Sequence, residues 1–520
     1  MASHDEVVTF LSAADVVGPG LPRIYQTHIA LVFVAGGRAI KIKRPVNFAY
    51  LDFSTLQARH QACLNEICVN RDNAPEIYRG VVAIAEAADG ALSIGGPGAP
   101  VEWAVEMAAF DDSDLLSQRA AQGPLDAALM RQTADAIHAM HVRSVPMCDV
   151  DAPGKMAAII EEVGTICELH ANIFPPDEVS AFVQAANDAN AIAREVLQSR
   201  VRSGFYRRCH GDLHLANVVI WNGKPTLFDA LEFSDEFGTV DTLYDLAFLL
   251  MDLVHHRQRS AANTVLNRYL WRSGGIRGTT DDIEALALMP LYIACRAGIR
   301  AMVGASRIAT AHIKGDERLA MLNDARRYLA EAKSALTHQS PRLIAIGGLS
   351  GSGKSTLAAR LAPLVGGTLG ALHIRSDLER KAMMGVEETE RLVREHYSRD
   401  QSRLVYDRVL KRAAAGLDAG QCVIVDAVFA TPEERERAAD IARTRGCPFN
   451  GIWLEAEPEA LRRRVADRRN DASDATIDVV EMQLDYTLGL LDWTRINAGR
   501  TAEQTLAEAM KILNQCAGGD

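Results

Sequence analysis

The sequence predicts a multidomain protein, in which an N-terminal α+β domain with two lobes precedes an α/β domain built on a parallel sheet. The chain has 520 residues, which is too many for a single hydrophobic core. A helical pattern over residues 317–336 is broken by the sequence HQSP at 338–341, which marks a boundary. Beyond this boundary, apolar runs at 342–348 and 422–429 are typical of buried parallel strands.

We therefore assign residues 1–339 to the first domain and residues 340–520 to the second. Hairpin patterns dominate the start of the first domain, and longer helical patterns follow them. We expect a small, mostly β lobe over residues 20–105 and a helical lobe over residues 106–337.

Composition excludes several classes of protein. Hydrophobic residues make up 48% of the chain, as in ordinary soluble proteins, and the net charge is −11. Residues 340–520 are close to neutral, which argues against general nucleic-acid binding. The nine cysteines form no CxxC pair, which favours a reducing cytoplasm. The N-terminus lacks a signal-peptide pattern, and the apolar run at 285–295 is too short to span a membrane, so a buried helix is expected.

The strongest motif is GLSGSGKS at 348–355, which matches G-x-x-x-x-G-K-[ST] in full. The glycines let backbone N–H groups turn toward phosphate oxygens, the lysine reaches the outer phosphates, and the final serine can hold Mg²⁺. The alternative is a plain glycine-rich turn, but an apolar strand precedes the motif and a helix pattern follows it. The predicted nucleotide-binding residues are Gly348, Gly351, Ser352, Gly353, Lys354, Ser355 and Thr356.

Acidic and basic residues beyond this motif favour a kinase. Asp377 follows a short strand pattern and is a candidate base for a substrate hydroxyl, with Arg380 one helical turn later as a candidate substrate ligand. Asp426 ends a buried strand and is a candidate for orienting Mg²⁺, although an aspartate at either position also suits helix capping. Arg464 and Arg468 have the spacing of one helix face, as a phosphate-clamping lid requires, and a solvated basic face is the alternative.

Residues 342–485 resemble the P-loop kinase family that includes gluconate kinase-like, zeta-toxin-like and polynucleotide 5′-kinase-like domains. The resemblance is carried by GLSGSGKST, by IRSD with Arg380, by VIVDAVF with Arg435, and by RxxxR followed by DASDA. It implies that Asp377 activates the accepting hydroxyl and that Arg464 and Arg468 form the lid. It does not identify the acceptor, because the members of this family phosphorylate different molecules.

A second chemical signature lies at 207–233, within RRCHGDLHLANVVIWNGKPTLFDALEF. Asp212 and Asn217 have the spacing of the kinase catalytic loop, and Asp229 follows a predicted hairpin that turns at Asn222-Gly223. In this chemistry one carboxylate activates the hydroxyl, while the amide and the second carboxylate hold Mg²⁺. His210 and His214 have the spacing of a zinc pair, but the residues between them break a helix and no HExxH glutamate is present.

The phosphate-binding lysine of this site should lie upstream. Residues 29–46 predict a hairpin that turns at Gly36-Gly37 and places Lys41 and Lys43 on one strand face. AIK at 39–41 resembles the V-A-I-K pattern, so Lys41 is the first candidate and Lys43 the second, with solvent exposure on an edge strand as the alternative. Glu66, in a helical stretch, is the candidate ion-pair partner. There is no glycine-rich phosphate loop, so residues 26–28 would make that turn.

Residues 20–335 resemble the aminoglycoside phosphotransferase family, a branch of the protein-kinase-like fold. HGDLHLAN, LFDALEF, VDTLYDLAFLL and the segments at 41–56 and 63–71 carry the resemblance. The whole chain is similar to fused proteins described as bifunctional aminoglycoside phosphotransferase/ATP-binding proteins. This resemblance implies two kinase domains that use ATP and Mg²⁺; it does not make an antibiotic the substrate.

We therefore expect a cytoplasmic kinase with two ATP sites that acts on small-molecule hydroxyl groups. Two alternatives stay open. One is a regulatory protein that binds ATP without transfer. The other is a C-terminal kinase for 5′-hydroxyl ends of nucleic acids, and a basic groove with aromatic platforms would favour this second alternative. The sequence identifies neither acceptor nor an oligomeric state.

Overall fold

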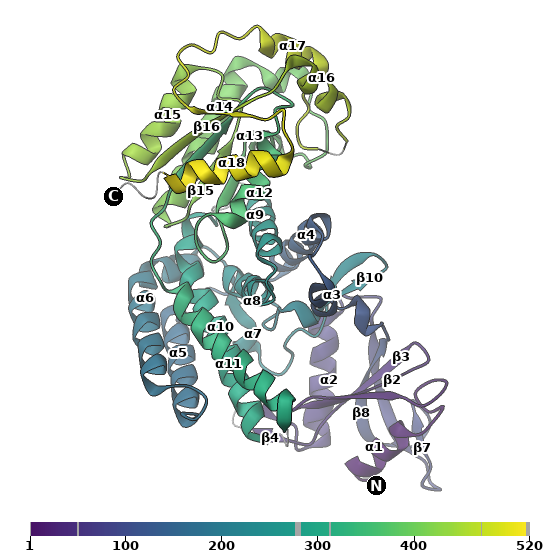
Figure 1. The fold of residues 1–520 in the computed structure, drawn as a ribbon. Helices are drawn as coiled ribbons and strands as arrows, with labels where there is room; N and C mark the ends of the chain where they lie inside the picture. The colour runs from purple at the N-terminus through teal and green to yellow at the C-terminus, as the bar shows by residue number, and fades with distance from the viewer. Residues whose placement is uncertain (1, 49–50, 276–281, 311–313, 470, 516–520) are drawn as a thin grey trace. The chain divides into compact units, whose positions relative to one another are not determined.

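The computed structural model describes residues 2–48, 51–275, 282–310, 314–469 and 471–515 (Figure 1). The chain divides into two compact units. The first unit comprises residues 1–150 and 200–252, and the second comprises residues 151–199 and 253–520. Among the described strands, no sheet crosses residue 340, because each main sheet takes its strands from one side of it. The exact domain boundary at 339/340 stays a prediction.

The first unit contains a six-stranded antiparallel sheet in the order β1-β2-β3-β8-β6-β7. Its strands are β1 (Arg23–Gln26), β2 (Ala30–Ala35), β3 (Arg38–Lys43), β6 (Tyr78–Glu86), β7 (Leu92–Ile94) and β8 (Ala99–Ala108). Ile40 and Ile42 of β3 pack with helix α1 (His4–Ser12) on one face, and Ala39 packs with helix α2 (Leu56–Asn70) on the other. The alternation of β3 directs Lys41 and Lys43 toward the α2 face.

Two predicted hairpins are confirmed in this unit. β2 pairs with β3 across Gly36 and Gly37, whose positive φ angles of 56° and 75° suit a tight turn. β10 (Val218–Trp221) pairs with β11 (Lys224–Leu227) across Asn222 and Gly223, with φ angles of 50° and 78°. The small lobe is thus mostly β, as expected, with α1, α2 and a short hairpin of β4 (Asn47–Phe48) and β5 (Leu51–Asp52) added. Residues 49–50 of the family-like segment 41–56 lie outside the described residues.

Helices expected in one helical lobe are divided between the two units. The first unit holds α3 (Leu116–Gln122), α4 (Ala127–Arg143), α7 (Asp235–Gly238) and most of α8 (Thr242–His255), with strands β9 (Tyr206–Arg208) and β12 (Thr239–Asp241). The second unit holds α5 (Ala152–Leu169), most of α6 (Pro176–Arg202), α9 (Arg259–Gly275), α10 (Met289–Thr310) and α11 (Gly315–Ala335). The segment Glu284–Ala309 is apolar and long enough to cross a membrane, but 67% of its apolar window is buried inside the protein, as a core helix would be.

The second unit also contains a five-stranded parallel sheet in the order β14-β15-β13-β16-β17. The strands are β13 (Leu343–Gly347), β14 (Leu372–Arg375), β15 (Val423–Asp426), β16 (Phe449–Glu455) and β17 (Thr494–Asn497). α12 (Lys354–Leu361) and α18 (Ala502–Gln515) pack on one face through a continuous apolar core. The helices α13 (Ser376–Met384), α14 (Arg399–Asp418) and α15 (Pro432–Arg443) lie against the other face (Figure 1). This arrangement confirms the predicted α/β fold.

Candidate active sites

In the first unit, the loop that joins β9 to β10 brings Asp212 and Asn217 together. The Asn217 amide nitrogen donates to the backbone oxygen of Asp212 at 2.9 Å and to Oδ2 of its carboxylate at 3.1 Å. Because both partners only accept, the amide oxygen Oδ1 faces away from Asp212. Asp245, in the first turn of α8, holds the loop through two hydrogen bonds. Its Oδ1 accepts from the Gly211 amide at 2.8 Å, and its Oδ2 accepts from the His210 amide at 3.2 Å. Asp245 thus has a structural role in this loop.

The two histidines of this loop have structural roles rather than the geometry of a metal pair. His210 Nε2 donates to the backbone oxygen of Phe228 at 2.9 Å, because a carbonyl can only accept. Burial lowers the pKa of His210, so its ring is neutral at physiological pH. His214 Nδ1 accepts from the Ala216 amide at 3.2 Å.

Asp229 follows β11 with a φ of +60°, in the left-handed region. Its backbone amide donates to the Tyr78 hydroxyl at 3.0 Å, which helps to hold this unfavourable conformation. A non-glycine residue in that region is uncommon and is often found where function requires a particular side-chain direction. Here the conformation directs the Asp229 carboxylate toward Lys41, at 2.6 Å from its Nζ.

A buried chain of alternating charges links Asp229, Lys41, Glu66, Lys43 and Glu232. Glu66 of α2 divides its carboxylate between Lys41, 2.8 Å from Oε1, and Lys43, 2.6 Å from Oε2. Lys43 also forms an ion pair with Glu232. Burial opposes charge on Glu66, but the two ammonium groups lower its pKa to about 2. Burial likewise opposes charge on Lys41, yet the carboxylates of Asp229, Glu66 and Glu232 hold the Lys41 pKa well above its usual value. β3 lies between β2 and β8, so the alternative of exposed edge lysines is wrong.

The donor set at this site fits Mg²⁺. The ion prefers carboxylate and amide oxygens, and the candidates are Oδ1 of Asn217 and the carboxylate of Asp229, whose side chain is 42% exposed. The turn from β1 to β2 covers residues 27–29, where the Thr27 amide donates to the Ala30 oxygen at 2.9 Å. The turn thus lies one residue later than the predicted 26–28, because Gln26 still belongs to β1, and its contact with phosphates stays a prediction.

In the second unit, the motif at 348–355 follows the carboxyl end of β13 and continues into the first turn of α12. Gly348, Gly351 and Gly353 have φ angles of 140°, 85° and 95°, which side chains rarely adopt. A Cβ at Gly351 would lie 2.6 Å from the backbone oxygen of Leu461, so this position also lacks space for one. The Lys354 ammonium donates to the Leu349 oxygen at 3.1 Å, across the loop. Burial lowers the pKa of Lys354, while Asp426 and Asp377 oppose that shift.

Asp426 ends its strand and Asp377 closely follows its own, as predicted, and the structure shows that the two strands, β15 and β14, are neighbours in the sheet. β14 ends at Arg375 and Asp377 lies in the first turn of α13, whereas Asp426 ends β15. Asp426 is buried, and burial alone would raise its pKa, but His373, Lys354 and Arg375 lower it. A carboxylate and a serine hydroxyl are suitable donors for Mg²⁺, and the roles of Asp426 and Ser355 as metal ligands stay predictions.

Two of the predicted arginine positions differ from expectation. α16 (Pro458–Ala466) ends before Arg468, so Arg464 and Arg468 do not share a helix face, and that part of the prediction is wrong. Arg464 still reaches the loop, with Nη1 3.4 Å from the Gly351 oxygen, and its Nη2 donates to the Ala498 oxygen at 2.7 Å. Among the described residues, Arg468 Nη1 has no hydrogen-bond partner, whereas Arg468 Nε lies 3.6 Å from the Asp471 carboxylate; the role of Arg468 as a phosphate ligand stays a prediction.

Arg380 is largely buried, and it contacts protein rather than an open pocket. Its Nη1 donates to the His396 oxygen at 2.7 Å, and its guanidinium lies 4.6 Å from the centre of the Tyr397 ring. Arg435 donates to the backbone oxygens of Phe429 and Leu490, at 2.8 and 2.9 Å, and is structural. The role of Arg380 as a substrate ligand stays a prediction.

The structure adds residues that the motifs did not identify. Arg375 Nη2 lies 3.1 Å from Asp471, and Arg375 Nε lies 3.9 Å from Asp426, so this side chain lies between the segment after α16 and the buried Asp426 carboxylate. The Gln483 side-chain oxygen accepts the Ser350 amide of the phosphate loop at 2.7 Å. Arg375 belongs to the IRSD segment that supported the family resemblance, so the sequence contained a signal for its role. No sequence pattern pointed to Gln483.

Comparison with known proteins identifies both types of domain. The family model described as "Phosphotransferase enzyme family" matches residues 99–281, and the one described as "AAA domain" matches residues 343–490. An uncharacterized protein of Mycobacterium tuberculosis strain H37Rv and one of Mycobacterium bovis are each 30% identical over 502 residues, covering 94% of this chain and 95% of the relative.

Solved structures are more distant. A gluconokinase from Sinorhizobium meliloti is 18% identical, covers 35% of this chain and 95% of its own, and has a TM-score of 0.26. A choline/ethanolamine kinase family protein from Mesorhizobium loti is 15% identical, covers 64% and 98%, and has a TM-score of 0.38. These scores are too low to support a function. The chain belongs to the family of its mycobacterial relatives, and it is a kinase that joins an aminoglycoside phosphotransferase-like domain to a P-loop kinase domain.

Proposed function

We propose that each unit carries one ATP-dependent phosphotransferase site, and that each site transfers the γ-phosphoryl group to a hydroxyl group of a small molecule. The observation that supports this most strongly is the arrangement in the first unit. Asp212 lies within hydrogen-bond distance of Asn217, while Lys41, Glu66 and Asp229 form one ion-pair network. A protein that only binds ATP has no need of a carboxylate in the position of Asp212.

In the first site, the carboxylate of Asp212 accepts the proton of the acceptor hydroxyl as its oxygen forms a bond to the γ-phosphorus. The bond from that phosphorus to the β–γ bridging oxygen breaks, and ADP leaves. When ATP binds, the Lys41 ammonium group gives up its ion pair with Asp229 and pairs with the phosphates instead. When bound by Asn217 and Asp229, Mg²⁺ supplies neutralisation of phosphate charge.

In the second site, Lys354 and the backbone amides of 348–355 bind the phosphates, and Asp377 accepts the proton of the acceptor hydroxyl. Arg464 and Arg468 are the proposed clamp on the transferred group. Ser355 and Asp426 are the residues that would hold Mg²⁺. The near-neutral charge of residues 340–520 favours a small molecule over a nucleic-acid end. A cytoplasmic location follows from the same assignment.

A screen of the full chain tests this proposal. Sugars, aminoglycosides, nucleosides and 5′-hydroxyl oligonucleotides are tested by thermal shift with an ATP analogue and Mg²⁺, and compounds that stabilise the protein are assayed for ADP release. We expect turnover of a small molecule that is lost in Asp212→Asn or in Lys354→Ala, according to the site used. The proposal would be contradicted if oligonucleotides were the only acceptors that are phosphorylated. It would also be contradicted if the protein bound both ATP and an acceptor but showed no turnover.

A further inference from the structure

One face of α9 lies along the free edge of the parallel sheet in the second unit. β14 is an edge strand, so the outward peptide groups near it need partners from outside the sheet. Asn263 Nδ2 donates to the oxygens of Leu369 and Ala371, at 2.8 and 2.9 Å, and the His373 amide donates to Oδ1 of Asn267 at 2.7 Å. The two asparagines are four residues apart and therefore lie on one helix face, where they replace a neighbouring strand.

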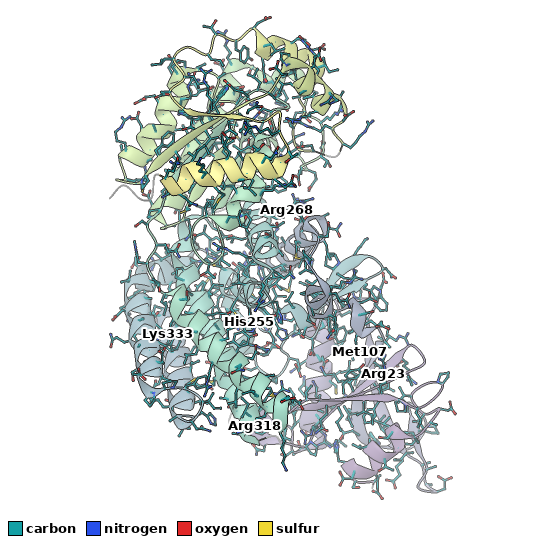
Figure 2. All side chains as sticks on the ribbon, viewed as in Figure 1. Arg23, Met107, His255, Arg268, Arg318 and Lys333 are labelled. Carbon is teal, nitrogen blue, oxygen red and sulfur yellow. The ribbon has the colours of Figure 1, made fainter. Side chains whose placement is uncertain are left out.

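The same helix also holds the segment that follows β14. Trp271 Nε1 donates to the backbone oxygen of Leu378 in α13 at 3.0 Å. Arg268, labelled in Figure 2, forms an ion pair of 2.7 Å with Glu388, and both side chains are mostly buried, at 10% and 20% exposure. Helix α9 thus contacts both ends of the segment 371–388, which carries Asp377 near its middle.

These contacts continue into the P-loop site. Glu388 Oε1 lies 3.7 Å from Arg375 Nη1, and Arg375 in turn faces Asp426 and Asp471. His373, whose amide is held by Asn267, has its ring nitrogen 3.7 Å from Asp426. The ion pairs therefore run from Arg268 through Glu388 and Arg375 to the carboxylate that would hold the metal.

We propose that α9 is the positioning element for the acceptor side of the P-loop site, and that Asn267 and Arg268 are its positioning residues. This inference rests on the proposed function of that site. The nucleotide side is formed by residues 348–356, for which α9 supplies none of the contacts described above, so ATP binding does not need these residues. The acceptor side depends on the placement of β14 and α13, and a shift of 1 Å there costs about 100-fold in rate. Helix α9 lies within the part of the chain that matches the phosphotransferase family, so the second site needs a segment of the first half.

The experiment uses the full chain with Asp229→Ala, which removes the metal carboxylate of the first site. Two quantities are measured with Mg²⁺: binding of a fluorescent ATP analogue, and slow ATP hydrolysis with water as the acceptor. In this background, Asn267→Leu and Arg268→Ala should each reduce hydrolysis by about tenfold or more, with nucleotide affinity within about twofold. Hydrogen exchange should become faster in residues 372–378, because their edge contacts are lost.

Conservative variants separate positioning from general structure. Asn267→Asp keeps the acceptor for the His373 amide, and Arg268→Lys keeps a cation for Glu388, so both should retain most of the hydrolysis. Arg272→Ala is the matched control. Arg272 also forms a 2.7 Å ion pair, but its partner Glu387 is 57% exposed and lies outside the chain of contacts to Arg375. The control should hydrolyse ATP at the rate of the background.

The outcomes distinguish this inference from the proposed function. If Lys354→Ala in the same background leaves ATP binding and hydrolysis unchanged, the proposed P-loop site is wrong. If Lys354→Ala removes both, while Asn267→Leu and Arg268→Ala behave like Arg272→Ala in rate and exchange, the role of α9 is overturned. If Asn267→Leu fails to fold, the role of α9 is tested by comparing the ATP hydrolysis rate of Arg268→Ala with that of Arg268→Lys.

Discussion

Nζ of Lys43 lies 2.6 Å from Oε2 of Glu66, and neither side chain is exposed to solvent. This contact separates the roles of two lysines on the same strand face. Lys41 also contacts Asp229, which is partly exposed, whereas Lys43 contacts only carboxylates that are buried, Glu66 and Glu232. Lys43 therefore links α2 to the loop after Asp229 through buried ion pairs that do not involve Lys41.

Replacing Lys43 should destabilise the first unit. Lys43→Met leaves the Glu232 carboxylate buried without a cation, which typically costs about 3–5 kcal/mol. The control Arg119→Ala breaks a 2.8 Å pair with Asp114 whose side chains are 40% and 38% exposed, and should cost less than about 1 kcal/mol. Urea unfolding with hydrogen exchange over residues 38–70 measures both. Adding Glu232→Leu to Lys43→Met should recover part of the loss, and a double variant that is less stable than the single one would contradict this reading.

Asp212 and Asp229 should affect different steps of the first reaction. In a Lys354→Ala background, Asp212→Asn should slow phosphoryl transfer by about 100-fold or more and leave ATP affinity almost unchanged, because it removes the base. Asp229→Ala should weaken the binding of Mg²⁺-ATP itself. Steady-state rates and titrations with an ATP analogue measure the two effects. Wild-type turnover in both variants would exclude a kinase site here.

The parts of these sites that the sequence predicted are the parts encoded locally. Asp212, Asn217 and Asp229 are set by loop and hairpin spacing, with Asn222-Gly223 as the turn. Glu232 was not identified, although it lies three residues after Asp229, because its partner Lys43 is far away in the chain. Long-range pairs of this kind leave no periodic signal in a single sequence.

Helix ends and interhelical contacts were predicted less well. The run LRRRVADRR contains no glycine or proline, so its pattern did not show that α16 ends at Ala466. Likewise, Asn263 and Asn267 look like ordinary polar residues on a helix. Their contacts with a strand edge about a hundred residues later follow only from the tertiary structure.

The second unit should lose stability as the pH rises through the folded-state pKa of His255, which lies above 6.5. His255, labelled in Figure 2, is buried, stacks on Tyr328, and lies 2.9 Å from Asp324 and 2.7 Å from Glu331. Burial alone would lower the pKa of His255, as Arg327 also does, but the two carboxylates raise it above 6.5. The protonated ring therefore contributes stability that is fully present below pH 6.5 and is lost as the pH rises through the folded pKa.

Thermal unfolding between about pH 6 and pH 9 tests this prediction. The wild-type midpoint should fall across the range, and His255→Asn should be less stable at the acid end and flatter with pH. His338→Asn, at an exposed histidine, is the control and should follow the wild type. Parallel curves for His255→Asn and the wild type would show that the ring does not change charge in this range.

The last prediction concerns stoichiometry: the chain should bind two ATP molecules. Lys354 belongs to the second unit, whereas Lys41, Asn217 and Asp229 belong to the first, so each proposed nucleotide site has its own candidate ligands for phosphate or Mg²⁺. Lys354→Ala deletes a charge-assisted contact worth about 1.5–3 kcal/mol, and should leave one strong site in isothermal titration. Lys41→Ala should leave the other, and it should still fold because Lys43 continues to pair with Glu66. If the wild-type chain bound only one ATP molecule, one half would have lost nucleotide binding. The single variants would then show which half that is.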